Sequence, residues 1–343
     1  MTEDEDALLT VRELRTHFHL DEGVLKAVDD VSFTLQRGQT LGIVGESGCG
    51  KSVAALTLLR LLPAFAKVEG DVLLRLNKGG RRGEVVNLAK LNPRGREIRG
   101  IRGGEMAMIF QEPMKAFSPV HTIGSQIIES IRLHRTRDRK EAREIAAQLL
   151  HSVGISNPGQ RLNEYPHQLS GGMRQRAMIA LALSGEPSVL IADEPTTALD
   201  VTIQAQVLQL INDLKEKNKM AVIFITHDMG VIAEMADDVA VMYMGKIVEY
   251  TTVENLFHRP AHPYTIALMN AMPSVRRKRE RLQPIEGAVP IPINIKPGCP
   301  FFSRCEHAVK GWCDKSDVAL TQIAPKHWVR CVFMQPREQG GAI

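Results

Sequence analysis

The residues with the clearest capacity for chemistry form the run Gly45-Glu46-Ser47-Gly48-Cys49-Gly50-Lys51-Ser52. Glycines in such a run let backbone N–H groups face an anion, and a helix beginning there adds the positive end of its dipole. Lys51 adds a full positive charge, and the Ser52 hydroxyl suits Mg²⁺. We therefore expect this loop to bind the phosphates of a nucleoside triphosphate. Cys49 is then a loop residue facing nucleotide, reactive when the loop is empty, and not a metal ligand.

An apolar run, Thr40 to Val44, precedes this loop, and an apolar-periodic run, Val53 to Leu62, follows it. Strand, glycine-rich turn and helix in that order are the context in which the motif binds phosphate, the alternative being a simple glycine-rich connection. Upstream, short alternating runs from Leu8 to Leu35 predict antiparallel strands. Phe18, near the end of the first strand, has two open roles, as a core residue or as a stacking surface for adenine.

Polar residues stand at the ends of three further predicted strands. Gln111 follows Met106 to Phe110, and His227 follows Ala221 to Ile225. Asp193-Glu194 ends the buried strand Ser188 to Ala192. Ligands bind at the carboxyl edge of parallel sheets, so Gln111 is a site candidate and His227 is placed to sense a γ-phosphate.

Asp193 and Glu194 are adjacent, so on a strand they point to opposite sides and cannot do the same work. Asp193 suits a Mg²⁺ contact, and Glu194 suits a general base that orients water. For either residue taken alone, capping of a following helix is the alternative. A second glycine turn, Ser170-Gly171-Gly172, also opens a helix, so the chain has two helix ends that attract anions.

The bulk properties set limits on the class of protein. The chain has 343 residues, enough for about two domains, and a formal net charge of +4, which does not by itself argue for nucleic acid. No apolar run approaches the ~18 to 20 residues of a membrane-spanning helix, and the acidic start is unlike a signal peptide. We expect a soluble, cytoplasmic protein. The basic stretch 75–104 is interpreted as a solvated loop, with contact to phosphates or a membrane surface left open.

Four of the five cysteines, Cys299, Cys305, Cys313 and Cys331, lie in the C-terminal part. This distribution suits a metal site in a reducing compartment better than disulfides. Four thiolates can hold a [4Fe-4S] cluster. Zinc is the alternative, with His307 and His327 as substitute ligands, although paired C-x-x-C steps are absent; unliganded thiols are the third interpretation. A metal would staple a small proline-rich region with little core.

These motifs, in this order and spacing, resemble the ATP-binding subunit of an ABC transporter; the quoted segments are Gly45 to Ser52, Gln111, Leu169 to Met173, Val189 to Glu194, Ala198 to Asp200 and His227. The resemblance implies an α/β fold: a P-loop NTPase core (RecA-like) with an N-terminal antiparallel β subdomain, an α-helical subdomain and a small metal-stapled C-terminal extension. We expect an ATPase domain at 1–255, with the helical subdomain at about 120–176, and the extension at 256–343.

The resemblance also implies residue roles. Lys51 would contact the β- and γ-phosphates, and Ser52 and Asp193, the Walker B acid, would bind Mg²⁺, which Gln111 links to the partner. Glu194 would be the catalytic base, and His227 would contact the γ-phosphate. Phe18 takes the adenine-stacking position. Ser170 to Gly172 would grip nucleotide held by another cassette, and Asp200 would lie in the loop across that interface, so the resemblance implies a dimer.

More narrowly, Thr196 to Thr202, Arg259 to Thr265 and Gly298 to Cys305 resemble the ATPases of dipeptide and oligopeptide importers, a group that includes nickel and oligosaccharide importers. The resemblance supports the iron–sulfur cluster. It implies an ATP-hydrolysing subunit that powers solute uptake, with peptide as the main expectation. Its partners would be a second ATPase, two transmembrane permeases and, indirectly, a solute-binding protein outside the cytoplasm; it would lie peripherally on the cytoplasmic face of the plasma membrane. The alternatives are a soluble ABC ATPase of DNA repair or translation, and a tail that senses redox state or metal.

Overall fold

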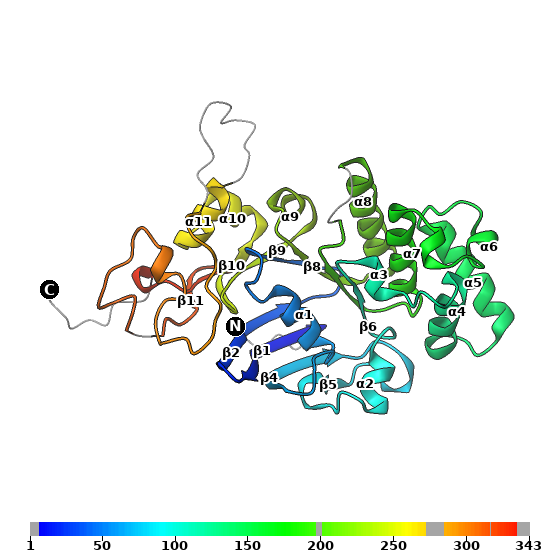
Figure 1. Ribbon diagram of the computed structural model, residues 1–343, viewed down its shortest axis with the longest axis horizontal. Helices are drawn as coiled ribbons and strands as arrows, with labels where there is room; N and C mark the ends of the chain where they lie inside the picture. Colours follow the sequence, from blue (N-terminus) through cyan, green and yellow to red (C-terminus); the bar gives the residue numbers. More distant parts are fainter. Residues whose placement is uncertain (1–6, 197–200, 272–284, 316, 335–343) are drawn as a thin grey trace.

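The computed structural model of the protein describes residues 7–196, 201–271, 285–315 and 317–334, whose strands form two sheets (Figure 1). The first sheet is antiparallel, with strand order β2-β1-β4-β5. Its strands are β1 (Leu9–Leu20), β2 (Gly23–Leu35), β4 (Ala66–Arg75) and β5 (Val85–Asn87). The antiparallel strands predicted at the start of the chain are therefore confirmed.

The second sheet has eight strands in the order β11-β12-β10-β9-β3-β8-β7-β6. Strands β9, β3, β8, β7 and β6 run parallel, and β10, β12 and β11 continue the sheet with antiparallel pairing. In chain order the strands are β3 (Thr40–Val44), β6 (Met106–Ile109), β7 (Val189–Asp193), β8 (Ala221–Thr226), β9 (Asp238–Tyr243), β10 (Lys246–Thr252), β11 (Thr321–Ala324) and β12 (His327–Val329). Every residue of β3, β6, β7 and β8 is buried, which accounts for sequences that are apolar except for a polar residue at an end of β3, β7 and β8.

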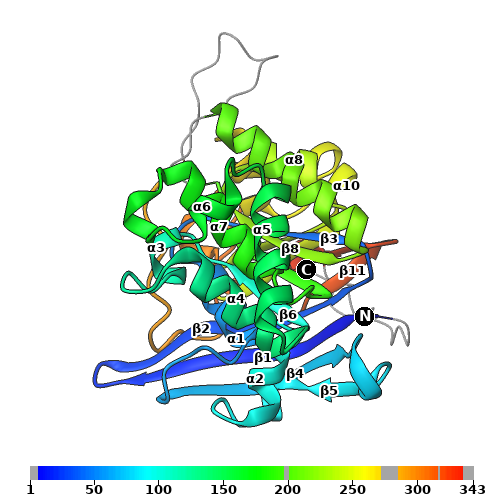
Figure 2. The ribbon, with the colours of Figure 1, turned by 90° about the vertical axis from the view of Figure 1, so that its right-hand side faces the viewer.

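Helices cover both faces of the second sheet. Helix α1 lies between the two sheets, and α4 to α7 gather at one end of the molecule (Figures 1 and 2). The α-helices are α1 (Lys51–Leu58), α2 (Arg96–Ile101), α3 (Pro113–Ala116), α4 (Ile123–His134), α5 (Arg139–Ser152), α6 (Pro158–Arg161), α7 (Gly171–Leu183), α8 (Val201–Asn218), α9 (Met229–Met235), α10 (Val253–His258) and α11 (Pro263–Asn270). None of the helices in the described ranges combines the length and the apolar character needed to span a bilayer.

The basic stretch 75–104 is only partly the solvated loop expected from its composition, because Arg81, Arg82, Lys90, Arg94, Arg96 and Arg99 are exposed as predicted. The stretch also contains β5 and α2, and two of its basic side chains bond to backbone carbonyls outside it. Arg102 donates to the carbonyls of Leu59 and Arg60, at 2.8 and 2.6 Å, and Lys78 donates to the carbonyl of Gly185. The charges therefore fasten this segment to the end of α1 and to the turn after α7.

The C-terminal part is joined to the main sheet, because β12 pairs with β10 and β11 pairs with β12. Few apolar side chains of this region are fully buried, and its main anchor, Phe301, packs into a core that it shares with the rest of the protein. Phe301 is 2% exposed and packs with Tyr243 and Tyr264, at 5.3 Å between ring centroids in each case. These rings belong to a hydrophobic cluster that also contains residues of β9 and α9.

Candidate functional site

The phosphate loop connects β3 to α1, as predicted, and two of its glycines leave no room for a Cβ atom. Gly45 and Gly50 have φ values of 153° and 106°. A Cβ atom on Gly50 would lie 2.2 Å from the carbonyl oxygen of Ala27, and one on Gly45 would lie 2.3 Å from that of Met242. The loop is also braced by the β9–β10 turn, where the Gly245 N–H donates to the Cys49 carbonyl at 2.8 Å. The glycines thus allow close backbone packing as well as phosphate access.

Lys51 is the first residue of α1, and its ammonium group lies over the loop. Its Nζ donates to the carbonyl oxygens of Gly45 and Glu46, at 2.7 and 3.1 Å. The side chain is buried, so the positive charge is concentrated at the turn between strand and helix. This is where an anion bound by the loop would lie.

Ser52 and Asp193 meet beneath the loop. The Ser52 hydroxyl donates to Oδ1 of Asp193 at 3.2 Å, which links the start of α1 to the end of β7. Burial raises the pKa of Asp193 above its usual value, and the Ser52 hydrogen bond opposes that shift. A buried carboxylate beside a hydroxyl is an oxygen donor set that suits Mg²⁺.

Glu194 bonds to both of the other strand-end candidates. Gln111 Nε2 donates to Glu194 Oε2 at 3.1 Å, and Nδ1 of His227 lies 3.3 Å from Oε1. Glu194 also has a φ of 45°, a left-handed conformation that is uncommon for a residue with a side chain. Its N–H donates to the carbonyl of Ile225 at the end of β8, which supports this turn. The structure therefore brings Gln111, Asp193, Glu194 and His227 to one edge of the sheet, as predicted.

Three other predicted residues or sets lie away from this cluster or outside the described residues. Ser170 caps α7, where its hydroxyl accepts from the Met173 N–H at 3.3 Å, and α7 lies with the helical layer apart from α1 (Figure 1). Phe18 packs against Phe65, at 5.8 Å between ring centroids. Asp200 lies outside the described residues.

The expectation of a reactive Cys49 thiol was wrong. The side chain is 1% exposed and belongs to the core beneath the loop. Burial raises the pKa of the Cys49 thiol, so little thiolate forms near neutral pH. Cys49 therefore contributes to the loop as a core residue, with its backbone at the turn.

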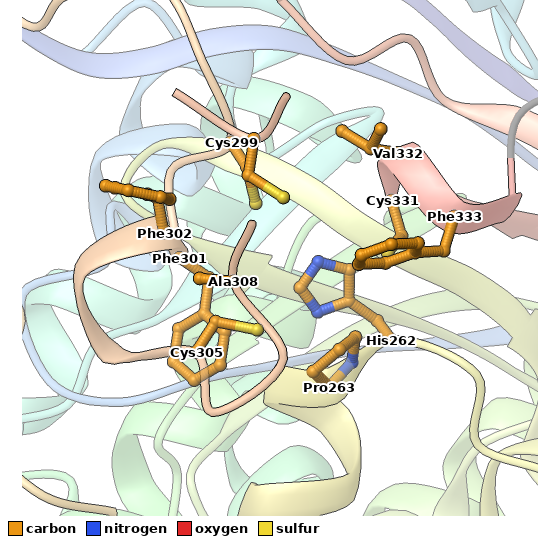
Figure 3. Close-up of a pocket in the computed structure, with 11 residues that line it drawn as sticks. His262, Pro263, Cys299, Phe301, Phe302, Cys305, Ala308, Cys331, Val332 and Phe333 are labelled. Atoms are coloured by element: carbon orange, nitrogen blue, oxygen red, sulfur yellow. The ribbon is translucent and has the colours of Figure 1, made fainter. Parts of the chain in front are cut away.

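The four C-terminal cysteines line one pocket. It is formed by His262, Pro263, Cys299, Phe301, Phe302, Cys305, Ala308, Cys313, Cys331, Val332 and Phe333. Figure 3 shows Cys299, Cys305 and Cys331 grouped around the imidazole ring of His262. Burial and the neighbouring thiols raise the pKa of Cys299 to about 11. The sequence therefore identified a set of thiols that folding brings together.

A single metal ion does not fit this arrangement. Among the described residues, no group of three His, Cys, Asp or Glu side chains is close enough to hold one ion. His327 was predicted as a substitute zinc ligand, but its Nε2 lies 2.8 Å from Oε1 of the fully buried Glu249. His307 is exposed and does not line the pocket. The histidine that does line it, His262, was not singled out from the sequence.

Sequence reasoning also missed the contacts that Glu46 of the phosphate loop makes. Tyr264 and Arg304, both from the part of the chain after β10, bond to Glu46. Both residues stand within the segments that carry the resemblance to importers, but spacing along the chain gives no signal that they approach the loop. A pairing 258 residues apart depends on the tertiary fold alone.

Two protein-family models match the sequence of this chain. The family model described as ABC transporter matches residues 28–197, and the one described as oligopeptide/dipeptide transporter, C-terminal region, matches residues 248–313. The probable peptide ABC transporter ATP-binding protein y4tR of Sinorhizobium fredii is 52% identical, with 95% of each chain covered. The dipeptide transport ATP-binding protein DppD of Bacillus subtilis is 44% identical, with 97% of each chain covered.

The fold is shared with solved structures at lower identity. The ATP-binding cassette MJ0796, in a dimeric post-hydrolysis state bound to ADP and Pi, superposes with a TM-score of 0.61 at 24% identity. The match covers 71% of this chain and 98% of that chain. The resemblance inferred from the motifs is thereby confirmed: the chain belongs to the ABC transporter family of ATP-binding proteins, and its C-terminal region is that of the oligopeptide/dipeptide transporters.

Proposed function

We propose that this protein is the ATP-hydrolysing subunit of an importer that takes up peptides. The observation that carries the proposal is that Gln111, Asp193, Glu194 and His227 meet at one edge of the sheet, where Asp193 bonds to Ser52 of the phosphate-loop motif. The relatives at 52% and 44% identity are named for peptide and dipeptide transport, which favours peptide over oligosaccharide or nickel. The motifs cover one cassette, and transport relatives match almost the whole chain, which disfavours a soluble ATPase of DNA repair or translation.

The loop residues divide the work of binding the triphosphate. The Lys51 ammonium donates to loop carbonyls in this structure, and with nucleotide bound it would donate to the β- and γ-phosphates instead. Ser52 and Asp193 would hold Mg²⁺, with Gln111 as a further oxygen donor. The bound metal would neutralise charge on the phosphates. Phe18 would stack on adenine from the end of β1.

Glu194 is the residue proposed to orient and deprotonate the attacking water. Its Oε1 and Oε2 contact His227 and Gln111, so the carboxylate is held at both oxygens. His227 is exposed at the end of β8, and its other ring nitrogen would contact the γ-phosphate. Positioning of this kind can contribute ~7 to 11 kcal/mol to a reaction that needs little covalent help.

The second helix end is proposed to complete another subunit's site. Ser170, Gly171 and Gly172 begin α7 in the helical layer, where an anion held by a second cassette would meet their N–H groups. Asp200, which lies outside the described residues, would contribute to the same interface. We therefore propose a dimer of ATPase subunits beneath two permeases, peripheral to the membrane on its cytoplasmic face. Closure of the dimer would make hydrolysis conditional on both halves being assembled.

The cysteine pocket is proposed to hold a [4Fe-4S] cluster. All four thiols line one pocket, whereas no three metal-ligating side chains of the described residues fit one ion. A cluster presents a different iron to each thiolate, so it accepts cysteines spaced more widely than a zinc ion does. When bound, it would cross-link the segments around residues 299–313 and 331. Anaerobic purification followed by iron and sulfide analysis tests this; protein without iron would contradict it.

The transport function is tested on the assembled membrane complex. The protein would be co-purified with its permeases and reconstituted, and ATP hydrolysis would be measured with peptides, oligosaccharides or nickel presented through the solute-binding protein. We expect stimulation by peptides. If only nickel or only oligosaccharides stimulated hydrolysis, that solute would be assigned in place of peptide. Hydrolysis that no solute and no permease affects would contradict the importer role.

A further inference from the structure

Glu46, the second residue of the phosphate loop, forms hydrogen bonds through its N–H, its carbonyl and its carboxylate. Its N–H donates to Oη of Tyr264 at 2.8 Å, and its carbonyl accepts from Lys51 Nζ at 3.1 Å. Its carboxylate accepts from both terminal nitrogens of Arg304, at 2.7 and 3.0 Å. Two residues from the C-terminal part of the chain therefore fix the conformation of the loop. We refer to Tyr264 and Arg304 as the loop clamp.

The guanidinium of Arg304 is itself immobilised. Its side chain is 6% exposed, and it donates to the carbonyls of Glu286 at 2.8 Å and Gly287 at 3.1 Å. It also lies 5.8 Å from the ring centroid of Tyr243, whose hydroxyl accepts from Nη1 at 3.3 Å. A two-nitrogen contact from a fixed guanidinium has far more geometric specificity than an exposed surface ion pair. Arg304 can therefore hold the Glu46 carboxylate in one orientation.

The loop clamp stands on the same aromatic core as the cysteine pocket. The ring of Tyr264 is fully buried and lies 4.7 Å from that of Tyr243, and Phe301 packs on both. Phe301 also lines the cysteine pocket. Arg304 is the last residue of the 3-10 helix η4 (Phe302–Arg304), and the pocket residue Cys305 follows it directly. The position of Arg304 therefore depends on how the cysteine segment folds.

The ion pair between Arg304 and Glu46 affects how the phosphate loop receives a nucleotide. A free carboxylate in a loop that must receive a triphosphate would repel it, and Arg304 neutralises that charge while turning the carboxylate away toward the C-terminal part. We propose that Arg304 and Tyr264 are positioning residues for nucleotide binding, through which the C-terminal region sets the conformation and charge of the phosphate loop. The inference rests on the proposed ATP-binding function and adds to it a control by residues outside the nucleotide motifs.

Nucleotide affinity and steady-state kinetics test the loop clamp. We would measure the Kd of a fluorescent ATP analogue, and KM and kcat for ATP, in the full-length protein. Arg304→Ala should weaken binding about ten-fold, within the range that small misplacements of binding groups cause, and should raise KM more than it lowers kcat. Tyr264→Phe, which removes only the hydroxyl, should weaken binding by a smaller factor. Unchanged Kd in both folded variants would overturn the inference.

A double-mutant cycle tests whether Arg304 acts through Glu46. In a Glu46→Ala background, Arg304→Ala should cause little further loss, because its partner is already absent. Equal losses in both backgrounds would overturn the inference. If Arg304→Ala fails to fold, Arg304→Lys takes its place, since lysine keeps the charge but not the two-nitrogen contact.

Arg330→Ala is the matched control. Arg330 is also buried, also precedes a cysteine, and pairs with Asp30 at 2.9 Å; its other side-chain bonds go to the carbonyls of Ile247 and Val318, and none of these partners lies in the phosphate loop. The Arg330→Ala substitution should lower Tm while leaving the Kd of the ATP analogue near the wild-type value. A Kd rise equal to that of Arg304→Ala would overturn the inference in favour of general loosening. A wild-type protein that bound no nucleotide would instead contradict the proposed function itself.

Discussion

His227 and Glu194 are joined across the ends of two neighbouring strands, with Nδ1 of the histidine 3.3 Å from Oε1 of the glutamate. The contact leaves the rest of the His227 ring exposed at the sheet edge, while the Glu194 side chain is only 12% exposed. Gln111 approaches Glu194 at its other carboxylate oxygen. The arrangement is that of a carboxylate held in place before any water or phosphate arrives.

Glu194→Gln should bind ATP and stabilise the dimer while losing hydrolysis. The amide keeps the size of the side chain and its contact with Gln111 but cannot accept a proton from water. We expect kcat to fall at least ~100-fold, the range in which loss of a general base lies. Single-turnover hydrolysis and size-exclusion chromatography with ATP measure the two effects. Wild-type turnover in this variant would reject Glu194 as the base.

The phosphate loop should tolerate alanine at one glycine and not at another. Gly50 and Gly48 both have positive φ, at 106° and 82°, but a Cβ on Gly50 would lie 2.2 Å from the carbonyl of Ala27, whereas one on Gly48 meets nothing within 4 Å. Gly48→Ala should therefore cost only conformational strain, about 1 to 2 kcal/mol. Gly50→Ala should cost clearly more and weaken nucleotide binding. Chemical denaturation of both variants measures the difference, and equal losses would contradict it.

The aromatic core of the C-terminal part should contribute strongly to stability. Phe301 is 2% exposed and packs on Tyr243 and Tyr264, so Phe301→Ala should lower the free energy of unfolding by about 3 to 5 kcal/mol. Trp312, which is 53% exposed, is the control, and Trp312→Ala should change stability by no more than about 0.5 kcal/mol. Urea unfolding of both variants is the measurement. Similar small effects would show that this region packs more loosely than its contacts indicate.

The strands and the nucleotide site were predictable because their signals are local. β3 was predicted with the bounds that it has, since a short, fully buried strand is mostly apolar along its length. Gln111, Asp193, Glu194 and His227 could be placed together because the carboxyl ends of parallel strands share one edge.

Contacts between distant parts of the chain could not be read in this way. Composition suggested that stretch 75–104 is solvated, which holds for most of its basic side chains, but Arg102 and Lys78 bond to backbone carbonyls that only the fold brings near. Likewise the cysteines were visible, whereas the core beneath them depends on Phe301 meeting Tyr243 and Tyr264. Burial of Cys49 was missed because a loop motif gives no information about which side chain turns inward.

Glu249 should make the attachment of the C-terminal strands sensitive to acid. It is fully buried in β10, where Oε1 contacts His327 and its two oxygens accept from the N–H groups of Ala261 and His262, at 2.9 and 2.8 Å. Burial alone would raise the pKa of Glu249, but these hydrogen bonds outweigh it and hold the pKa below the usual value of 4.5. The stabilisation is therefore present above about pH 4.5 and is lost as the pH falls through the lowered pKa.

Glu249→Gln tests this assignment, because glutamine has one acceptor oxygen where the carboxylate has two. At neutral pH it should lower the free energy of unfolding by about 3 kcal/mol, as removal of one partner from a buried pair does. Glu254→Gln, at an exposed position in α10, is the control and should have little effect. On acidification the wild type should lose more stability than Glu249→Gln, because the variant has no carboxylate to protonate at this position. Unfolding measured at pH values on both sides of 4.5 decides it: parallel losses in the two proteins would show that Glu249 is not a source of the acid sensitivity.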